Sequence, residues 1–273
     1  MLALLDAPDQ LLGTVTPGSG PIGTTTAETG SLRLAARMPP REDPTAPRLV
    51  YGAAATAFGT RVLFGDVAAA GARGLAVAAR LLDAFRAGAD HEPDLARVVY
   101  HMDLSLRGER SGAEELARVV LLEHRPDGLV AVVNRGGPAP VHVSGGLARA
   151  VDEPLGQPPI GVLNPESLRV PALPVPTSPG DRFLLRTGAS DAAWPERGGA
   201  VAGALEGDFA RALDGVGRAD ADVASGPTGP RAGASTSGVC LVEVGDPADA
   251  TVPTGEAEAY RRARLPRNPL RRA

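Results

Sequence analysis

Asp66 is the carboxylate whose position in the sequence most suggests a functional site. It follows the apolar run Val62-Leu63-Phe64-Gly65, and small residues lead from it into a long amphipathic stretch. This pattern predicts a buried strand that enters a sharp turn carrying the carboxylate. Such a position is common in metal and phosphate sites. The chemistry therefore depends on whether other carboxylates converge on Asp66; alone, it is equally a turn residue that caps the following helix.

Three other acids are candidates to join Asp66. Asp191 stands in Ser190-Asp191-Ala192, where an Asp also commonly starts a helix or turn. Asp220 and Asp222 stand in a Gly-rich stretch that could fold back toward Asp66. The four histidines have no ligand spacing, and the Gly-x-Ser-x-Gly elbow of hydrolases is absent. We interpret the single Cys240 as a core residue, because one cysteine excludes an internal disulfide and a cysteine-rich zinc site.

Composition excludes several classes of function. The chain has 273 residues and a net charge of -4, which argues against a nucleic-acid binder. Every basic side chain apart from histidine is arginine. No run reaches the roughly 20 apolar residues of a membrane span. The first five residues are apolar, but Asp6 and Asp9 follow and no basic segment precedes them, so we expect no signal peptide and a bacterial cytoplasmic location.

The elements expected to position Asp66 are several strands in succession, with pairs of helices between them. This order favours an α+β fold with mainly antiparallel sheets. We expect a flexible tail over residues 1–29, one domain over 30–245 and an Arg/Pro-rich tail over 246–273, which either contacts an acidic partner or is a plain solubilising tail. Within the domain, residues 152–180 are expected to be irregular. The expected strands are 30–37, 49–51, 61–64, 116–123, 128–133, 140–143, 182–186 and 239–244, with a short one from Leu147; the expected helices are 75–87, capped by Gly88, 93–106 and 200–213.

Five ordered motifs resemble one known family. Gly65 to Gly71 is similar to Gly-Asp-Val-x-Gly-His-Gly, and Asn134 to Pro140 is similar to Asn-Ala-Gly-His-Pro-Pro-Pro. Ala35 to Pro40, Pro159 to Val162 and Pro179 to Thr187 match in the same order. The chain thus resembles the PPM-type, metal-dependent protein serine/threonine phosphatases, in the branch typified by the stage II sporulation protein E of bacteria. The resemblance implies a four-layer αββα sandwich: two mainly antiparallel sheets flanked by helix pairs.

The resemblance also implies a centre of two Mg²⁺ or Mn²⁺ ions held by aspartates. Asp66 would offer its carboxylate and Val67 its backbone carbonyl, with Asp191 as a displaced ligand. The other acidic positions of the family are missing: residues 50–56 contain no acid, and glycines stand at 188 and 238. The family histidines are replaced as well, by Ala70 and Gly137. We therefore expect no stable binuclear centre and no cofactor, with Mn or Mg bound only if the protein is active.

The sequence leaves three hypotheses for function. The first is a pseudophosphatase in signalling that binds a regulatory protein, by family resemblance an anti-sigma-factor antagonist or its kinase. The second is an atypical Mn- or Mg-dependent phosphatase that uses Asp66 with a displaced acid such as Asp191. The third is a small-molecule binder that uses the vacated cleft.

Overall fold

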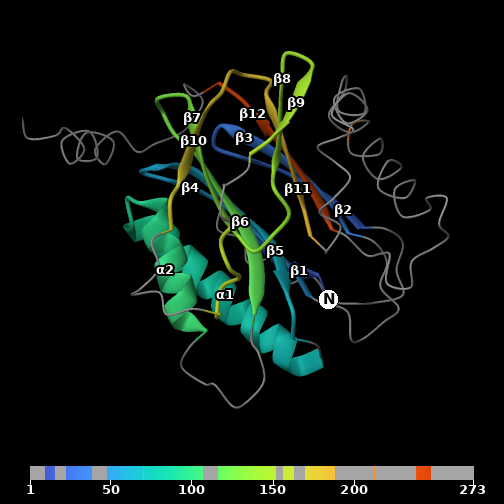
Figure 1. Ribbon diagram of the computed structural model, residues 1–273, viewed down its shortest axis with the longest axis vertical. Helices are drawn as coiled ribbons and strands as arrows, with labels where there is room; N and C mark the ends of the chain where they lie inside the picture. The colour runs from blue at the N-terminus through green and yellow to red at the C-terminus, as the bar shows by residue number, and fades with distance from the viewer. Residues whose placement is uncertain are drawn as a thin grey trace, which may run out of the picture.

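Two six-stranded sheets, in which every paired strand runs antiparallel, form the body of the structure (Figure 1). The computed structural model describes residues 10–15, 23–38, 48–69, 71–106, 116–151, 156–162, 170–187, 212 and 238–246. The first sheet contains, in spatial order, β1 (Gln10–Val15), β4 (Arg48–Thr56), β5 (Gly59–Val67), β6 (Ala117–His124), β7 (Leu129–Arg135) and β10 (Leu173–Pro176). The second contains β2 (Gly23–Thr29), β3 (Leu32–Met38), β12 (Val239–Val244), β11 (Arg182–Arg186), β8 (Val141–Ser144) and β9 (Leu147–Ala150).

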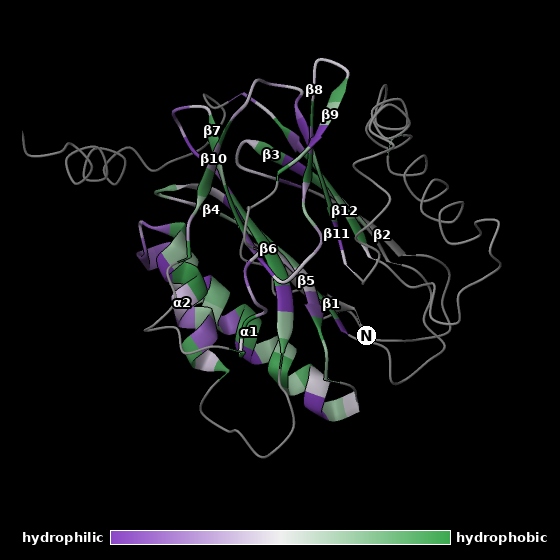
Figure 2. Cartoon of the chain, viewed as in Figure 1, coloured by the Kyte–Doolittle hydropathy of each residue, from purple (hydrophilic) through white to green (hydrophobic). Residues whose placement is uncertain are grey.

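Alternation along each strand divides the core into layers. In β5, Val62 and Phe64 pack between the two sheets, whereas Leu63 and Val67 pack against the helices. The central strands β4, β5, β6 and β7 therefore bury apolar side chains on both faces. Green stretches along β4 and β6 show this in Figure 2. This arrangement confirms the predicted α+β sandwich. By the same alternation, Asp66 belongs to the face between the sheets.

Two antiparallel helices, α1 (Gly71–His91) and α2 (Leu95–Ser105), cover the outer face of the first sheet (Figure 1). The predicted apolar stripe of the second helix is confirmed, because Leu95, Val98, Val99, Met102 and Leu106 are all buried. The predicted C-cap at Gly88 is wrong, since α1 continues to His91. Gly88 instead allows close packing of the helices: a Cβ there would lie 3.1 Å from Cγ1 of Val98.

The hairpins are mostly where their turn residues predict. Gly128 closes the turn between β6 and β7 with a φ of 77° and donates to the Arg125 carbonyl at 3.0 Å. The β4–β5 turn lies at residues 57–58, two residues before the predicted Gly59-Thr60. Thr56 explains the shift, because its hydroxyl donates to the Gly59 carbonyl and accepts from the Phe58 amide, which tightens the turn at this place.

Two parts of the predicted organisation need correction. Residues 10–15 and 23–29 do not belong to a loose tail, because β1 pairs with β4 and β2 pairs with β3 along their full lengths. A Thr-rich segment with little apolar content still adds to a sheet edge, since backbone hydrogen bonds suffice there. Within the stretch 152–180, which was expected to be irregular, Leu173–Pro176 forms β10. This strand lies at the edge of the first sheet opposite β1. Its two prolines are tolerated because an edge strand needs only one row of hydrogen bonds.

Of the third predicted helix, only Ala212 lies within the described residues, where it is helical and buried against the outer face of the second sheet. The helix pair expected on that face lies otherwise outside the described part of the chain, as does the predicted tail after residue 246. Within the described part, no helix has the length and apolar character needed to cross a membrane.

Candidate functional site

The guanidinium of Arg118 forms an ion pair with the carboxylate of Asp66. Its Nε donates to Oδ1 at 2.9 Å and its Nη2 donates to Oδ2 at 3.0 Å, so the pair is bidentate. Asp66 is 2% exposed and the Arg118 side chain is 28% exposed. The two residues stand directly opposite each other on β5 and β6. A bidentate arginine satisfies the charge and both oxygens of the carboxylate that was expected to face a metal ion.

Apolar and small residues surround this pair. On the other side of Asp66, its partner on β4 is Leu49, whose buried side chain packs between the sheets. Leu49 also fills the space above the second sheet: a Cβ added to Gly238 would lie 2.8 Å from one of its methyl groups. The Gly238 amide donates to the Thr187 hydroxyl at 2.8 Å, which ties together the ends of β11 and β12. The place expected to hold several acids is therefore filled by a leucine and an arginine.

These described residues do not fit a centre of two divalent cations. Hard cations need several oxygen ligands, and each added dication needs negative charge. Asp66 is the one carboxylate at this end of the described strands, and Arg118 already neutralises it. No cluster of three or more His, Cys, Asp or Glu side chains that could hold a metal occurs within the described ranges.

The structure places the predicted ligands only in part. Asp66 and Val67 are neighbours at the end of β5, where the Val67 side chain packs on the helix-covered face. The metal contact predicted for the Val67 backbone carbonyl stays a prediction. Asp191, Asp220 and Asp222 lie outside the described residues, as does Ala70. A role of Asp191 as a displaced ligand therefore stays a prediction. Gly137 accepts and donates hydrogen bonds with the Asn134 side chain, so this motif forms a self-contained turn.

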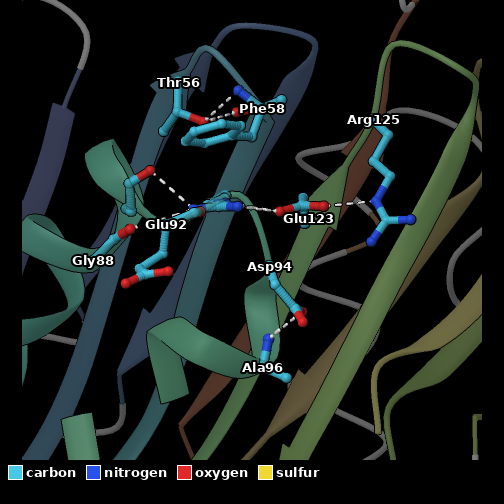
Figure 3. A network of polar contacts seen from close by, with 11 residues as sticks. Thr56, Phe58, Gly88, Glu92, Asp94, Ala96, Glu123 and Arg125 are labelled. Atoms are coloured by element: carbon cyan, nitrogen blue, oxygen red, sulfur yellow. Dashed lines mark hydrogen bonds and ion pairs between the residues drawn. The ribbon is translucent and has the colours of Figure 1, made fainter. Parts of the chain in front are cut away.

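A second buried ion pair lies under the helices, at the other end of β5 and β6. Figure 3 shows Glu123 at the centre of this network, with Arg125 on one side and the backbone of Gly88 and Glu92 on the other. Arg61 donates through Nε to Glu123 at 2.8 Å and through Nη1 to the carbonyls of Ala89 at 2.9 Å and Glu92 at 2.6 Å. Both charged side chains are fully buried. Arg61 thus satisfies carbonyl groups left open where α1 ends.

A third pair, Asp103 and Arg135, fastens the loop that contains Pro159. Arg135 donates to Asp103 at 2.9 Å and to the Pro158 carbonyl at 2.7 Å. The other oxygen of Asp103 accepts from the Gly161 amide at 2.7 Å. The Pro159 to Val162 motif is therefore held to α2 by buried charges, which gives it a structural role.

The histidines and the cysteine do not form a catalytic group. His124 is buried and accepts or donates at 2.6 Å with the Ser31 hydroxyl; burial lowers its pKa, and Asp127 offsets this in part. His142 contacts Asp181 at 3.1 Å and stacks on Phe183. Burial raises the pKa of the Cys240 thiol to about 12, so this thiol stays protonated.

Sequence reasoning missed Arg118 as the partner of Asp66. One signal was present in the sequence. Alternate residues of a strand share a face, so Arg118 lies on the same face as Val120 and Leu122, which pack between the sheets. A charged residue on an inward-facing position needs a counter-charge. Finding that counter-charge required the β5–β6 register, which joins residues 52 positions apart.

Comparison with known proteins places this geometry in a family. The family model for stage II sporulation protein E matches residues 56–206, more than half of the 273-residue chain. A search of curated protein sequences finds no match.

Several solved structures share the fold of this chain. The RsbU and RsbW domains of Rv1364c from Mycobacterium tuberculosis align with a TM-score of 0.58 and 20% identity, covering 79% of this chain and 60% of that chain. The phosphatase domain and regulatory fragment of SpoIIE from Bacillus subtilis align with a TM-score of 0.51 and 12% identity, covering 89% and 82%. The catalytic domain of the phosphatase PstP in complex with 2 manganese ions aligns with a TM-score of 0.53 and 16% identity, covering 79% and 99%. At these identities the likeness concerns the fold.

Proposed function

Because the chain belongs to the stage II sporulation protein E family, we propose that it is a pseudophosphatase: a signalling protein that keeps the phosphatase fold and binds a regulatory protein. The observation that carries this proposal is the bidentate contact of Arg118 with Asp66. A guanidinium that already neutralises the carboxylate removes the main attraction for a dication at this place.

The proposed partner is an anti-sigma-factor antagonist or its kinase. The support is a solved relative in which an RsbU domain and an RsbW domain occur in one protein. The present chain spans 60% of that relative. Binding is tested by titrating candidate antagonist domains, with and without phosphoserine, into the purified full chain. Indifference to every such domain would remove the partner from the proposal.

Metal content separates a pseudophosphatase from a catalyst. Calorimetric titration of the full chain with Mn²⁺ is expected to show no stoichiometric binding. A matched variant, Leu49→Asp with Arg118→Ser, frees Asp66 and places a second carboxylate directly opposite it on β4. We expect Mn²⁺ to bind this double variant at least tenfold more tightly than it binds the wild type.

Activity of the wild type would overturn the proposal. Mn²⁺-dependent hydrolysis of p-nitrophenyl phosphate that disappears in Asp66→Ala would establish the alternative, an atypical phosphatase. Loss of the same activity in Asp191→Ala would then identify the displaced acid.

A further inference from the structure

His124 joins the two sheets at the end of β5 and β6 that lies away from Asp66. It is 1% exposed, and its Nδ1 lies 2.6 Å from the hydroxyl oxygen of Ser31, in the turn between β2 and β3. The Ser31 amide also donates to the hydroxyl of Thr60 at 3.3 Å, and Thr60 stands directly opposite His124 in the first sheet. Side chains from two neighbouring strands of the first sheet therefore hold this turn of the second sheet.

Backbone hydrogen bonds hold the same turn to the second sheet. The Ser31 carbonyl accepts from the Gly245 amide at 2.7 Å, directly after β12, and β3 pairs with β12 over six residue pairs. Gly30 has a φ of 53° and lies so close to the first sheet that a Cβ there would overlap the Thr60 hydroxyl. The turn is thus built into the second sheet by its backbone, whereas the described contacts with the first sheet are with side chains.

The His124 ring lacks one hydrogen-bond partner. Its Nε2 is buried and has none among the described residues. A neutral ring tolerates this, because it has one N–H and one lone pair and the Ser31 hydroxyl satisfies either of them. A protonated ring has an N–H at both nitrogens and a positive charge, so it would bury a charged donor without an acceptor. The closed arrangement therefore suits the neutral ring and disfavours the cation.

Nearby charges do not compensate for this burial. Asp127, in the turn after β6, favours the protonated ring, but burial outweighs it and holds the pKa of His124 below its ordinary value of 6.5. The Asp127 carboxylate is exposed and accepts from the Leu129 amide. Other charged side chains near this end of the strands pair with one another or are exposed: Glu28, Arg33, Arg61, Glu123, Arg125, Glu243 and Asp246. The ring can therefore carry a charge at low cost only where water reaches it.

We propose that this contact is a pH-sensitive latch: protonation of His124 releases the β2–β3 turn from the first sheet and admits water to the ring. The turn stays on the second sheet, because its backbone hydrogen bonds there involve no titrating group. The latch is closed while the ring is neutral and opens as the pH falls below about 6.5, the ordinary histidine value that applies to the open state. Below that pH the open population rises by about tenfold per pH unit until the closed ring also titrates. The latch does not depend on the proposed pseudophosphatase function.

Amide hydrogen exchange of the full chain at pH 7.5 and 5.5 tests the latch, with exchange times scaled for the chemical exchange rate at each pH. We expect the Ser31 amide and its neighbours in the turn to lose protection about tenfold at pH 5.5, through an opening that low concentrations of urea do not promote. Amides of β12 are expected to follow the global free energy of unfolding and its urea dependence. Unchanged protection of the turn, or a turn that exchanges only together with β12, would overturn the proposal.

Variants of two histidines assign the effect. His124→Asn keeps a polar side chain beside Ser31 but does not titrate, so the local opening of the turn is expected to be independent of pH. His101→Asn is the matched control, because His101 is partly exposed on α2 and pairs with Glu92 at 2.8 Å; it is expected to keep the pH dependence of the wild type. A local opening that still depends on pH in His124→Asn would assign it to another group and contradict the latch.

A third variant keeps the test independent of any folding defect in His124→Asn. Ser31→Ala removes the hydroxyl that contacts the ring, so the turn is expected to lose protection already at pH 7.5. Because a weaker latch is open more of the time, the pKa of the His124 ring, measured by NMR titration, is expected to move from its lowered value toward 6.5. An equal ring pKa in the wild type and in Ser31→Ala would show that the turn does not control access to the ring, and the proposal would fail.

Discussion

Arg118 holds both oxygens of the Asp66 carboxylate, and Asp66 is almost completely removed from water. Removing one member of a buried pair leaves the other charge without compensation, whereas replacing both by apolar residues is often neutral. We therefore expect Arg118→Leu to lower the free energy of unfolding by about 3 kcal/mol at pH 7. Urea denaturation measures this loss, and the double variant Asp66→Leu with Arg118→Leu is expected to recover most of it.

An exposed ion pair provides the comparison. Arg33 pairs on the surface with Glu28, where both side chains are about half exposed or more, and its Nη1 also lies 3.3 Å from Glu243, which keeps Arg182 as a partner. Exposed pairs contribute roughly 0–1 kcal/mol, so Arg33→Leu should change stability by no more than that. Equal effects of Arg118→Leu and Arg33→Leu would mean that the Asp66 pair is not a buried pair in solution.

His124 gives the fold a dependence on pH. Burial lowers its pKa in the folded state, so between that value and about 6.5 the unfolded chain binds more protons than the folded one. Its contribution to stability is therefore complete above about pH 6.5 and is lost as the pH falls below that value. His124→Asn keeps a polar atom near the Ser31 hydroxyl and is expected to flatten this part of the curve, as measured by urea midpoints between pH 7.5 and 5.5. An unchanged slope would assign the dependence to other groups.

Among the elements, the end of α1 depends on one side chain from the sheet. Arg61 joins Glu123 on β6 to the carbonyls of Ala89 and Glu92, so it connects helix and sheet. Arg61→Met leaves the carbonyls open and removes one of the two arginines on the buried Glu123, whose other oxygen still accepts from Arg125 at 2.6 Å. We expect a loss of about 1–3 kcal/mol. Amide hydrogen exchange should show the loss of protection first in α1 and α2. Loss spread evenly over both sheets would argue against this local role.

The same elements show what a sequence can predict here. Val98 and Met102 fall on one face at helical spacing, and Leu184 sits in an apolar run between turn residues, so α2 and β11 are local properties of the chain. The partners of Asp66 and Arg61 are not local. Each pair joins strands separated by the two helices, and a carboxylate in a strand carries no mark of which cation will stand opposite it. The fold was therefore largely predictable, whereas the occupant of the Asp66 site was not.

For the whole molecule, β1 and β2 complete one edge of each sheet. β1 covers the edge of β4 over six residue pairs, and β2 covers the edge of β3 over seven. Deletion of residues 1–29 would expose two strand edges, which favours aggregation. We expect Tm to fall by roughly 5–10 °C, since each kcal/mol corresponds to about 2–4 °C in a chain of this size.

Deletion of residues 248–273 is the matched control, because the last described strand, β12, ends at Val244 and the Gly245 amide already donates to the Ser31 carbonyl at 2.7 Å. If 246–273 is the tail that the sequence predicts, this deletion leaves Tm within about 2 °C. The two truncations remove similar lengths from opposite ends, so general effects of shortening the chain cancel between them. A stable, monomeric product of the N-terminal deletion would show that β3 and β4 do not need the strands that pair with them, and that the domain begins near residue 30 after all.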